Sequence, residues 1–379
     1  MNVEECIHYT KKRKINPDRL TVLTLGDPHF KVKNIKDTEL MVQKVINLVT
    51  ETKPHLIVVL GDILDRFESI HVSPLVRAVK FLIQLSNLSK VIVLIGNHDR
   101  QNNSDFLSDF HPFTALEENP NIIIASKVID LHVKLNENGI EFIDGNLIDS
   151  ENVMHFALVP YVYPGRFEEA LNTNKWISHN GIEKLDCIFA HQEFRGCKMG
   201  VVKSIVGDEW APERPFVVSG HIHEYQVLQE NIVYTGSLLQ NNYGDNHDKT
   251  ISFFDMIKGS KITITERRVS LDLPKKMIIR LTCDEVSDCK ICYDDEVKIV
   301  ISGNIVELKS IDKSNKVLKW RKRGIPVQLK EIVNKEDPNK TTDENNTSVD
   351  KKTFTDALYQ NVKKEKSIRR LFKELFGDI

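Results

Sequence analysis

A strand that ends in Gly-Asp constrains this chain more than any other stretch. Residues Leu56–Leu60 form an unbroken run of apolar residues, and Gly61 and Asp62 follow it directly. Such a run predicts a strand buried on both faces, as in a parallel sheet covered by helices. Open α/β sheets bind their ligands at the carboxyl ends of the strands. The sequence therefore predicts that Asp62 places a carboxylate in a ligand-binding crevice.

Four more predicted strands end in polar residues of the same kinds. The residues that follow them are Asp27 and His29, Asn97 and His98, His191, and His221 and His223. Aspartate, asparagine and histidine are ligands of divalent cations. A pair of cations needs one carboxylate that bridges them, and Asp62 is the expected bridge. We expect Asp27, His29 and His223 to hold one cation. We expect Asn97, His191 and His221 to hold the other.

The neighbours of these ligands predict how the centre acts. His98 follows a ligand but points elsewhere, so we expect it to act on a phosphate as a catalytic residue. Asp65 is expected to hydrogen-bond the His98 imidazole and keep it protonated. The mixed donor set suits two Mn²⁺ ions, with Fe²⁺ or Mg²⁺ as alternatives. A hydroxide that bridges two such ions would attack phosphorus directly, without a covalent intermediate.

The order of predicted elements indicates an α/β domain over residues 1–258. Helices alternate with strands early, including a helix at 37–51, and strands dominate later, which predicts two packed sheets with helices outside. Residues 128–135 and 140–143 are predicted strands joined by a hairpin turn. The order of elements thus predicts a layered domain that contains all of the candidate ligands.

The rest of the chain is predicted to form three further parts. Residues 259–333 form a small α+β module, with alternation at 297–301 and 327–329 and a short basic helix at 315–323. Residues 334–352 are almost free of apolar side chains and predict a disordered linker. Residues 353–379 predict an amphipathic helix, which either docks on its own domain or occupies a partner's groove.

Charge and composition limit the function classes. The formal net charge of −2 gives no case for nucleic acid binding by the molecule as a whole, so any basic surface must be local. No signal peptide and no apolar run near 20 residues is recognisable, which predicts a soluble, intracellular protein without a membrane partner. The basic run Lys11–Lys14 reads either as a nuclear signal or phosphate contact, or as a solvated lead-in. The sequence therefore leaves cytoplasm and nucleus open.

The cysteines predict free thiols in a reducing compartment. All six are scattered along the chain, as is usual for proteins without disulfides. Cys283, Cys289 and Cys292 lie close enough in sequence to suggest a metal site. Three thiolates without a fourth ligand nearby favour ordinary cysteines.

The strand-end motifs resemble those of the calcineurin-like metallophosphoesterase family over residues 1–258. The matching segments are Gly26-Asp27-Pro28-His29, Gly61-Asp62-Ile63-Leu64-Asp65-Arg66, Gly96-Asn97-His98-Asp99, His191, and Gly220-His221-Ile222-His223. The resemblance implies a four-layered α/β/β/α sandwich with a two-metal centre and hydrolase activity. The ligand roles it implies agree with those argued from the strand ends.

Within that family the chain resembles the Mre11/SbcD DNA nucleases and their viral and phage relatives. Asp99 stands where protein phosphatases usually have Glu. Residues 234–237 followed by 243–245 resemble a segment of those nucleases, and the module at 259–333 resembles their DNA-capping domain. The resemblance implies an exonuclease or endonuclease of DNA repair and recombination. It also implies a Rad50/SbcC-type ATPase bound through residues 353–376, and homodimer formation is a further expectation.

One residue departs from the nuclease pattern. Arg66 is more typical of phosphatases, in which it contacts the substrate phosphate. The alternative functions are therefore a phosphomonoesterase that acts on a protein or small molecule, or a non-catalytic scaffold. A scaffold would be expected to have lost metal ligands, whereas this chain has them all.

Overall fold

The computed structural model describes residues 19–67, 69–136, 139–143, 153–200, 202–259, 262–291 and 295–332. The basic run Lys11–Lys14, the predicted linker 334–352 and the predicted helix 353–379 lie outside these residues. In the part of the chain described here, no helix is both long and apolar enough to cross a membrane.

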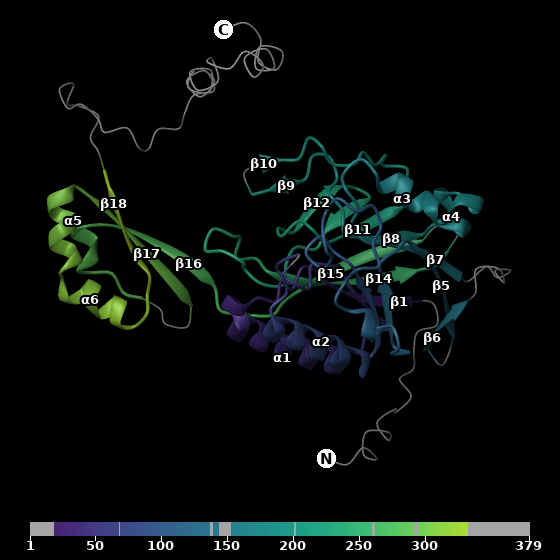
Figure 1. Cartoon of the computed structure of the whole chain (residues 1–379), viewed down its shortest axis with the longest axis horizontal. Coiled ribbons are helices and arrows are strands. Elements are labelled where there is room, and N and C mark those ends of the chain that lie inside the picture. The colour runs from purple at the N-terminus through teal and green to yellow at the C-terminus, as the bar shows by residue number, and fades with distance from the viewer. Residues whose placement is uncertain are drawn as a thin grey trace, which may run out of the picture. The chain divides into compact units, whose positions relative to one another are not determined.

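The first sheet has six strands in the order β15-β14-β1-β2-β3-β4, of which β15, β14 and β1 are labelled in Figure 1. Four of them run parallel: β1 (Arg19–Leu25), β2 (Leu56–Val59), β3 (Lys90–Leu94) and β4 (Ile122–Ala125). The antiparallel strands β14 (Thr250–Ile257) and β15 (Thr263–Ser270) complete the sheet. The carboxyl ends of β1, β2 and β3 therefore lie at one edge.

The second sheet has seven strands in the order β12-β13-β11-β8-β7-β5-β6. They are β5 (Ile129–Asn136), β6 (Gly139–Ile143), β7 (Val153–Val159), β8 (Cys187–Ala190), β11 (Phe216–Ser219), β12 (Gln226–Gln229) and β13 (Ile232–Tyr234). Strands β7, β8, β11 and β13 run parallel. Asn136 pairs with Gly139 between antiparallel β5 and β6, which confirms the predicted hairpin.

Helices cover the outer face of each sheet. The helices α1 (Ile35–Thr52) and α2 (Val72–Ser86) pack on the first sheet, and α3 (Phe167–Thr173) and α4 (Lys175–Asn180) pack on the second. In α1, Met41, Val45 and Val49 recur every four residues and are buried. The short 3₁₀ helices are η2 (Val32–Asn34), η3 (Thr114–Leu116), η5 (Ile182–Lys184) and η6 (Asp284–Val286).

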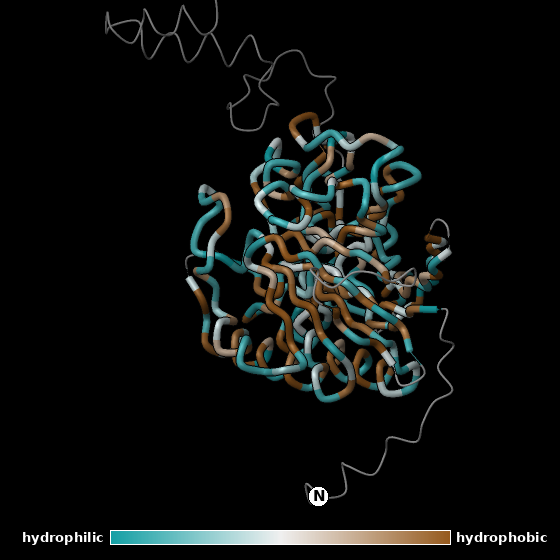
Figure 2. Tube along the Cα trace, turned by 90° about the vertical axis from the view of Figure 1, so that its right-hand side faces the viewer, coloured by the Kyte–Doolittle hydropathy of each residue, from teal (hydrophilic) through white to brown (hydrophobic). Residues whose placement is uncertain are grey.

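Alternation along the central strands produces three apolar interfaces. Leu23 and Ile57 face α1 and α2, whereas Val22 and Val58 face the second sheet. Both faces of these strands are thus buried, and in Figure 2 the strands are coloured brown along much of their length. The packing confirms the predicted four-layered α/β/β/α sandwich, with one apolar interface between the two sheets and one under the helices on each outer face.

The sandwich extends further along the chain than predicted. Residues 263–270 form β15 and pair with β14, so the boundary placed at residue 258 is too early. The reason is that β15 is an edge strand whose side chains are alternately exposed and half-buried. Its exposed positions are mostly polar, so its sequence looks like the start of a separate module. A two-stranded ribbon of β9 (Lys198–Met199) and β10 (Val202–Lys203) follows the His191 strand.

The small α+β module has its own core. It contains β16 (Lys276–Thr282), β17 (Glu296–Gly303), β18 (Val327–Glu331), α5 (Ile305–Asp312) and α6 (Asn315–Lys322). Its apolar centre includes Ile299, Leu308 and Trp320. The alternating stretches and the basic helix were predicted, but β16 and α5 were not. Asn304 begins α5 with a capping box to Glu307, a signal that could have located the helix.

Candidate metal centre

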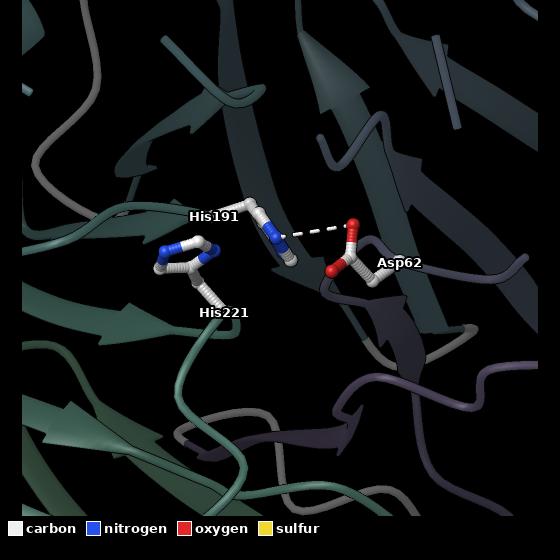
Figure 3. A group of neighbouring side chains, drawn as sticks. All are labelled: Asp62, His191 and His221. Atoms are coloured by element: carbon white, nitrogen blue, oxygen red, sulfur yellow. Dashed lines mark ion pairs between the residues drawn. The ribbon is translucent and has the colours of Figure 1, made fainter. Parts of the chain in front are cut away.

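The strand ends of both sheets bring the predicted ligands together. Asp62 follows β2, His191 follows β8 in the other sheet, and His221 follows β11. His191 Nε2 lies 3.3 Å from Asp62 Oδ1 (Figure 3). Asp62 lies more than 100 positions from both histidines in the chain, so only the packing of the two sheets places it beside them.

Two groups of possible metal ligands share one carboxylate. Asp62, His191 and His221 form one group, and Asp27, His29 and Asp62 form the other, with donor atoms within 4.8 Å of one another in each. Asp62 therefore lies where a bridging ligand is required, as the sequence predicts.

The remaining two predicted ligands join these groups. Asn97 Oδ1 lies 3.1 Å from His191 Nε2 and 2.9 Å from His221 Nδ1. His223 Nε2 lies 2.9 Å from His29 Nε2. The structure thus gathers all seven predicted ligands, divided between two positions as expected.

Backbone carbonyls orient two of the imidazoles. His191 Nδ1 lies 2.6 Å from the Leu60 carbonyl oxygen, and His29 Nδ1 lies 3.2 Å from that of Leu64. When each Nδ1–H donates to its carbonyl, each Nε2 carries a lone pair that faces the centre of the site. Metal-bound histidines are commonly held in this way.

An unsatisfied oxygen indicates that a cation fits here. Asp27 is fully buried, and its Oδ1 accepts a hydrogen bond from the His221 backbone at 3.0 Å. Its Oδ2 has no hydrogen-bond partner within the part of the chain that the structure describes. Burying an unpaired carboxylate oxygen is costly. A cation between Asp27 and the imidazoles would satisfy it, so the donor set fits a pair of divalent ions.

Burial and mutual charge shift the pKa values of the acidic ligands. Burial raises the pKa of Asp27 to about 7. Burial alone would also raise the pKa of Asp62, but the imidazoles, with His191 foremost, hold it well below its usual range. One carboxylate of the pair is thus firmly ionised, and the other becomes fully ionised only when more positive charge is near.

Burial and neighbouring charges also shift the pKa values of the candidate histidine ligands. Burial lowers the pKa of His29 and of His221 to about 3, which leaves both imidazoles neutral. Burial would also lower the pKa of His191, but Asp62 and Asp27 raise it to about 9. His29 and His221 therefore offer neutral nitrogen donors beside the ionised Asp62, and His191 would release its proton when a cation binds.

The backbone is strained where it carries the ligands. Asp27, His29, Asp62 and His221 have φ values of 38°, 46°, 49° and 77°. Only two other non-glycine residues in the described ranges have positive φ. Such conformations cost energy and concentrate at functional sites. The strained backbone of three loops directs four side chains toward one point.

Two motif glycines permit this close approach. A Cβ on Gly96 would lie 2.3 Å from Asp62 Oδ1. Gly61 has a φ of 98°, and a Cβ there would lie 2.6 Å from His191 Nδ1. Any larger residue would displace a candidate ligand, which explains why glycine precedes both Asp62 and Asn97.

His98 lies at the solvent side of the centre. Its side chain is 32% exposed, whereas that of Asp62 is 2% exposed, and its Nε2 lies 3.9 Å from Asp62 Oδ2. Its backbone N–H donates to Asp62 Oδ1 at 2.9 Å. A partly exposed imidazole over a buried ligand can reach a substrate that the centre binds.

The predicted contact between Asp65 and His98 is not formed. Asp65 instead accepts a hydrogen bond from Lys31 Nζ at 3.0 Å. His98 Nδ1 has no hydrogen-bond partner among the described residues. The Lys31 ammonium group pairs with the Asp65 carboxylate, which leaves Asp65 directed away from His98. Arg66, the predicted substrate contact, is exposed beside Asp65.

Two supporting residues escaped the sequence prediction. Asp99 accepts backbone hydrogen bonds from Ile63, Leu64 and Gly96 at 2.8–3.2 Å, which ties the Asp62 loop to the Asn97 loop. Lys249 Nζ donates to the His223 carbonyl at 2.7 Å and to Ser237 at 3.0 Å. The position of Asp99 after Asn97-His98 was a usable signal, but nothing local marks Lys249.

Comparison with known proteins agrees with this geometry. Residues 20–225 match the family described as Calcineurin-like phosphoesterase, a span that contains all seven predicted ligands. The chain is 34% identical over 317 residues to "Putative phosphoesterase 078R" of Invertebrate iridescent virus 3, covering 83% of this chain and 85% of that protein. It is also 34% identical over 307 residues to "Putative phosphoesterase 244L" of Invertebrate iridescent virus 6, covering 79% and 100%.

One solved structure aligns with this chain at low similarity. GAP50, described as the anchor in the inner membrane complex of Plasmodium, aligns with a TM-score of 0.43 and 13% identity. The alignment covers 67% of this chain and 85% of that chain. At this level the likeness carries no argument about function.

Proposed function

The chain belongs to the calcineurin-like phosphoesterase family, and we propose that it hydrolyses phosphodiester bonds in DNA as a nuclease of the Mre11/SbcD type. Phosphoester hydrolysis by a metal-dependent centre is the family's chemistry. The choice of DNA, of Mn²⁺ and of a role in DNA repair or recombination belongs to the proposal.

The observation that carries the proposal is the shared carboxylate beneath a partly exposed histidine. Asp62 belongs to both ligand groups, and His98 Nε2 lies 3.9 Å from it on the solvent side. Two divalent ions bound here would supply Lewis acidity to the phosphoester and lower the pKa of water. The protein's part is to hold the ligands rigidly and to offer His98 to the reacting phosphate.

The roles of the remaining side chains follow from their positions. Asp99 keeps the Asp62 and Asn97 loops in register, so that both ligand groups keep one geometry. His98 is placed to donate a proton to a non-bridging oxygen or to the leaving group. Asp65 acts on Lys31 rather than on His98, so we assign it no direct catalytic role.

The small module supports DNA over a compact substrate. Residues 276–331 form a folded unit after the last ligand, which a phosphomonoesterase does not require. Arg66 is the residue on which the phosphomonoesterase alternative rests. It is exposed and forms no ion pair among the described residues, so its charge is available to a phosphate of either substrate. A non-catalytic scaffold is disfavoured because all seven ligands and His98 are present.

The partner assignments are proposals that rest on the resemblance. Residues 353–376 would bind a Rad50/SbcC-like ATPase, and the chain would also form a homodimer. Deleting residues 353–379 should spare cleavage of short DNA and abolish co-precipitation of the ATPase. Retained co-precipitation by the truncated protein would rule out that segment as the binding site.

A direct test compares substrates on one preparation. Purified full-length protein with Mn²⁺ is offered labelled single-stranded and double-stranded DNA beside p-nitrophenyl phosphate. We expect DNA cleavage at a higher kcat/KM than monoester hydrolysis, and loss of both with His98→Ala. Turnover of the monoester alone would replace the nuclease with the phosphomonoesterase.

A further inference from the structure

A basic pocket adjoins the metal centre on the side of His223. Its volume is about 340 Å³. The loop after β1 and the loop after β2 form most of its wall, and Asn241, Asn242 and Lys276 complete it. The loop after β1 also carries His29, and the loop after β2 also carries Asp62. The pocket therefore lies next to the candidate metal ligands.

Lys31 and Asn241 connect the pocket to the metal ligands. Lys31 Nζ donates to Asp65 at 3.0 Å and to Asn241 Oδ1 at 3.2 Å. Asn241 Nδ2 in turn lies 3.5 Å from His223 Nδ1. Asn241 therefore lies between a candidate metal ligand and the pocket.

The charge of the pocket is positive although the chain is not. Its described lining includes Lys31, Lys33, Arg66 and Lys276 but only one acidic residue, Asp65. Asp65 neutralises Lys31. Lys276 pairs with Asp37 at 2.9 Å and lies 3.8 Å from Glu296.

Two positively charged side chains of the pocket remain available to a bound molecule. Lys33 and Arg66 are exposed and form no ion pair within the described ranges. With a net charge of −2 for the whole chain, this is a local concentration of positive charge. It is the kind of local basic surface that a polyanionic substrate requires.

The neutral groups of the pocket also suit a nucleic acid backbone. Ser69, Asn241 and Asn242 supply hydrogen-bond donors of the kinds that contact phosphates and sugars. Ile70 also lines the pocket and is 45% exposed, which provides an apolar surface for a sugar or base. A compact monoester held at the metals would leave all of these groups unused.

We propose that this pocket binds a second, non-scissile phosphate of a polynucleotide, and that Lys33 and Arg66 set a preference for chains of phosphates over single ones. The proposal rests on the proposed nuclease function and adds a specificity site to it. The occupant is the phosphate next to the scissile one, held by two cations and by amide and hydroxyl donors.

The test compares two diesters that differ in their number of phosphates. Bis(p-nitrophenyl) phosphate has only the scissile phosphate, whereas a labelled oligothymidylate has neighbours on both sides. The variant is Lys33→Gln, and the matched control is Lys80→Gln, an equally exposed lysine on α2 outside the pocket. Both variants remove one charge from full-length protein.

We expect Lys33→Gln to raise KM for the oligonucleotide by about tenfold relative to bis(p-nitrophenyl) phosphate, since charged hydrogen bonds are the stronger kind. The slope of log KM against log salt for the oligonucleotide should become shallower by about 0.7, the value for one lost single-strand phosphate contact. Lys80→Gln should change neither quantity. A merely structural effect of Lys33 would lower activity on both substrates and leave the slope alone.

Each remaining result overturns a different claim. Equal losses on both diesters, or a Lys33→Gln protein that matches Lys80→Gln, would remove the second subsite and leave the nuclease intact. If the wild-type protein cleaves bis(p-nitrophenyl) phosphate but no DNA, the proposed function fails and the subsite fails with it.

Discussion

Replacement of Asp62 by asparagine is the sharpest test of the metal centre. Asparagine keeps an oxygen that can accept the His98 backbone N–H, which now reaches Asp62 Oδ1 at 2.9 Å, so the local fold should survive. The change removes the one negative charge that both ligand groups share. Asp62→Asn should therefore empty both metal positions together rather than one.

The expected loss can be scaled from metal sites in general. Removing a partner that only orients a ligand weakens metal binding by about 10- to 100-fold, so removing a shared ligand should cost at least about 100-fold at each position. At a Mn²⁺ concentration near ten times the wild-type Kd, occupancy would fall from roughly nine-tenths to roughly one-tenth by mass action. The charge lost is also the one that raises the pKa of His191 to about 9.

The assay is elemental analysis after equilibrium dialysis against Mn²⁺, with circular dichroism to check folding. Asp65→Asn is the matched control, because it removes a carboxylate three residues away that pairs with Lys31 and belongs to neither ligand group. We expect about two ions per chain in the wild type and in the control, and fewer than half an ion in Asp62→Asn. A folded Asp62→Asn protein with both ions would refute the shared bridge.

Three further changes probe the residues around the centre. His98→Ala should keep both ions but lower kcat by about 10²–10⁴, the range for a lost acid–base group, and rapid turnover with full metal would contradict its role. Lys249→Met should weaken Mn²⁺ binding by about tenfold in a titration, since the residue holds the His223 carbonyl, and Lys249→Arg should restore part of it. Burial lowers the pKa of His155 to about 4, below the ordinary 6.5, so this neutral histidine favours the fold above pH 6.5 and loses that contribution as the pH falls toward 4. In denaturant titrations His155→Gln should reduce the acid sensitivity by roughly 1–2 kcal/mol after allowance for its partial exposure.

Much of the centre was predictable because parallel strands align their carboxyl ends. Once Asp27, Asp62 and Asn97 each follow a predicted parallel strand, the sheet places them at one edge whatever the details of packing. The histidines of the second sheet needed one more assumption, that the two sheets face each other with these edges together. The motifs therefore predicted which residues could bind metal, and the sheet topology predicted that these residues lie close together.

The sequence prediction was wrong where one side chain had two possible hydrogen-bond partners. Asp65 is three residues from Asp62 and was assigned to His98, but Lys31 takes it instead. Which partner Asp65 contacts depends on the direction of the loop after Asp62. Asp62 has a φ of 49°, which no strand or helix pattern predicts. The β15 boundary failed for a related reason, since an edge strand is defined by its neighbour β14 and not by its own composition.

The hydrogen bonds around the centre explain why the ligands form one rigid unit. The carbonyl of Leu60, directly after β2, accepts from His191, which follows β8 of the second sheet. The carbonyl of Leu64 in the following loop accepts from His29. Asp99 fastens that same loop to the turn that begins at Gly96. A shift of the β2 loop would therefore move ligands of both groups at once. The arrangement makes the two metal positions depend on each other, so a change in this loop should alter both affinities even where it touches neither ion.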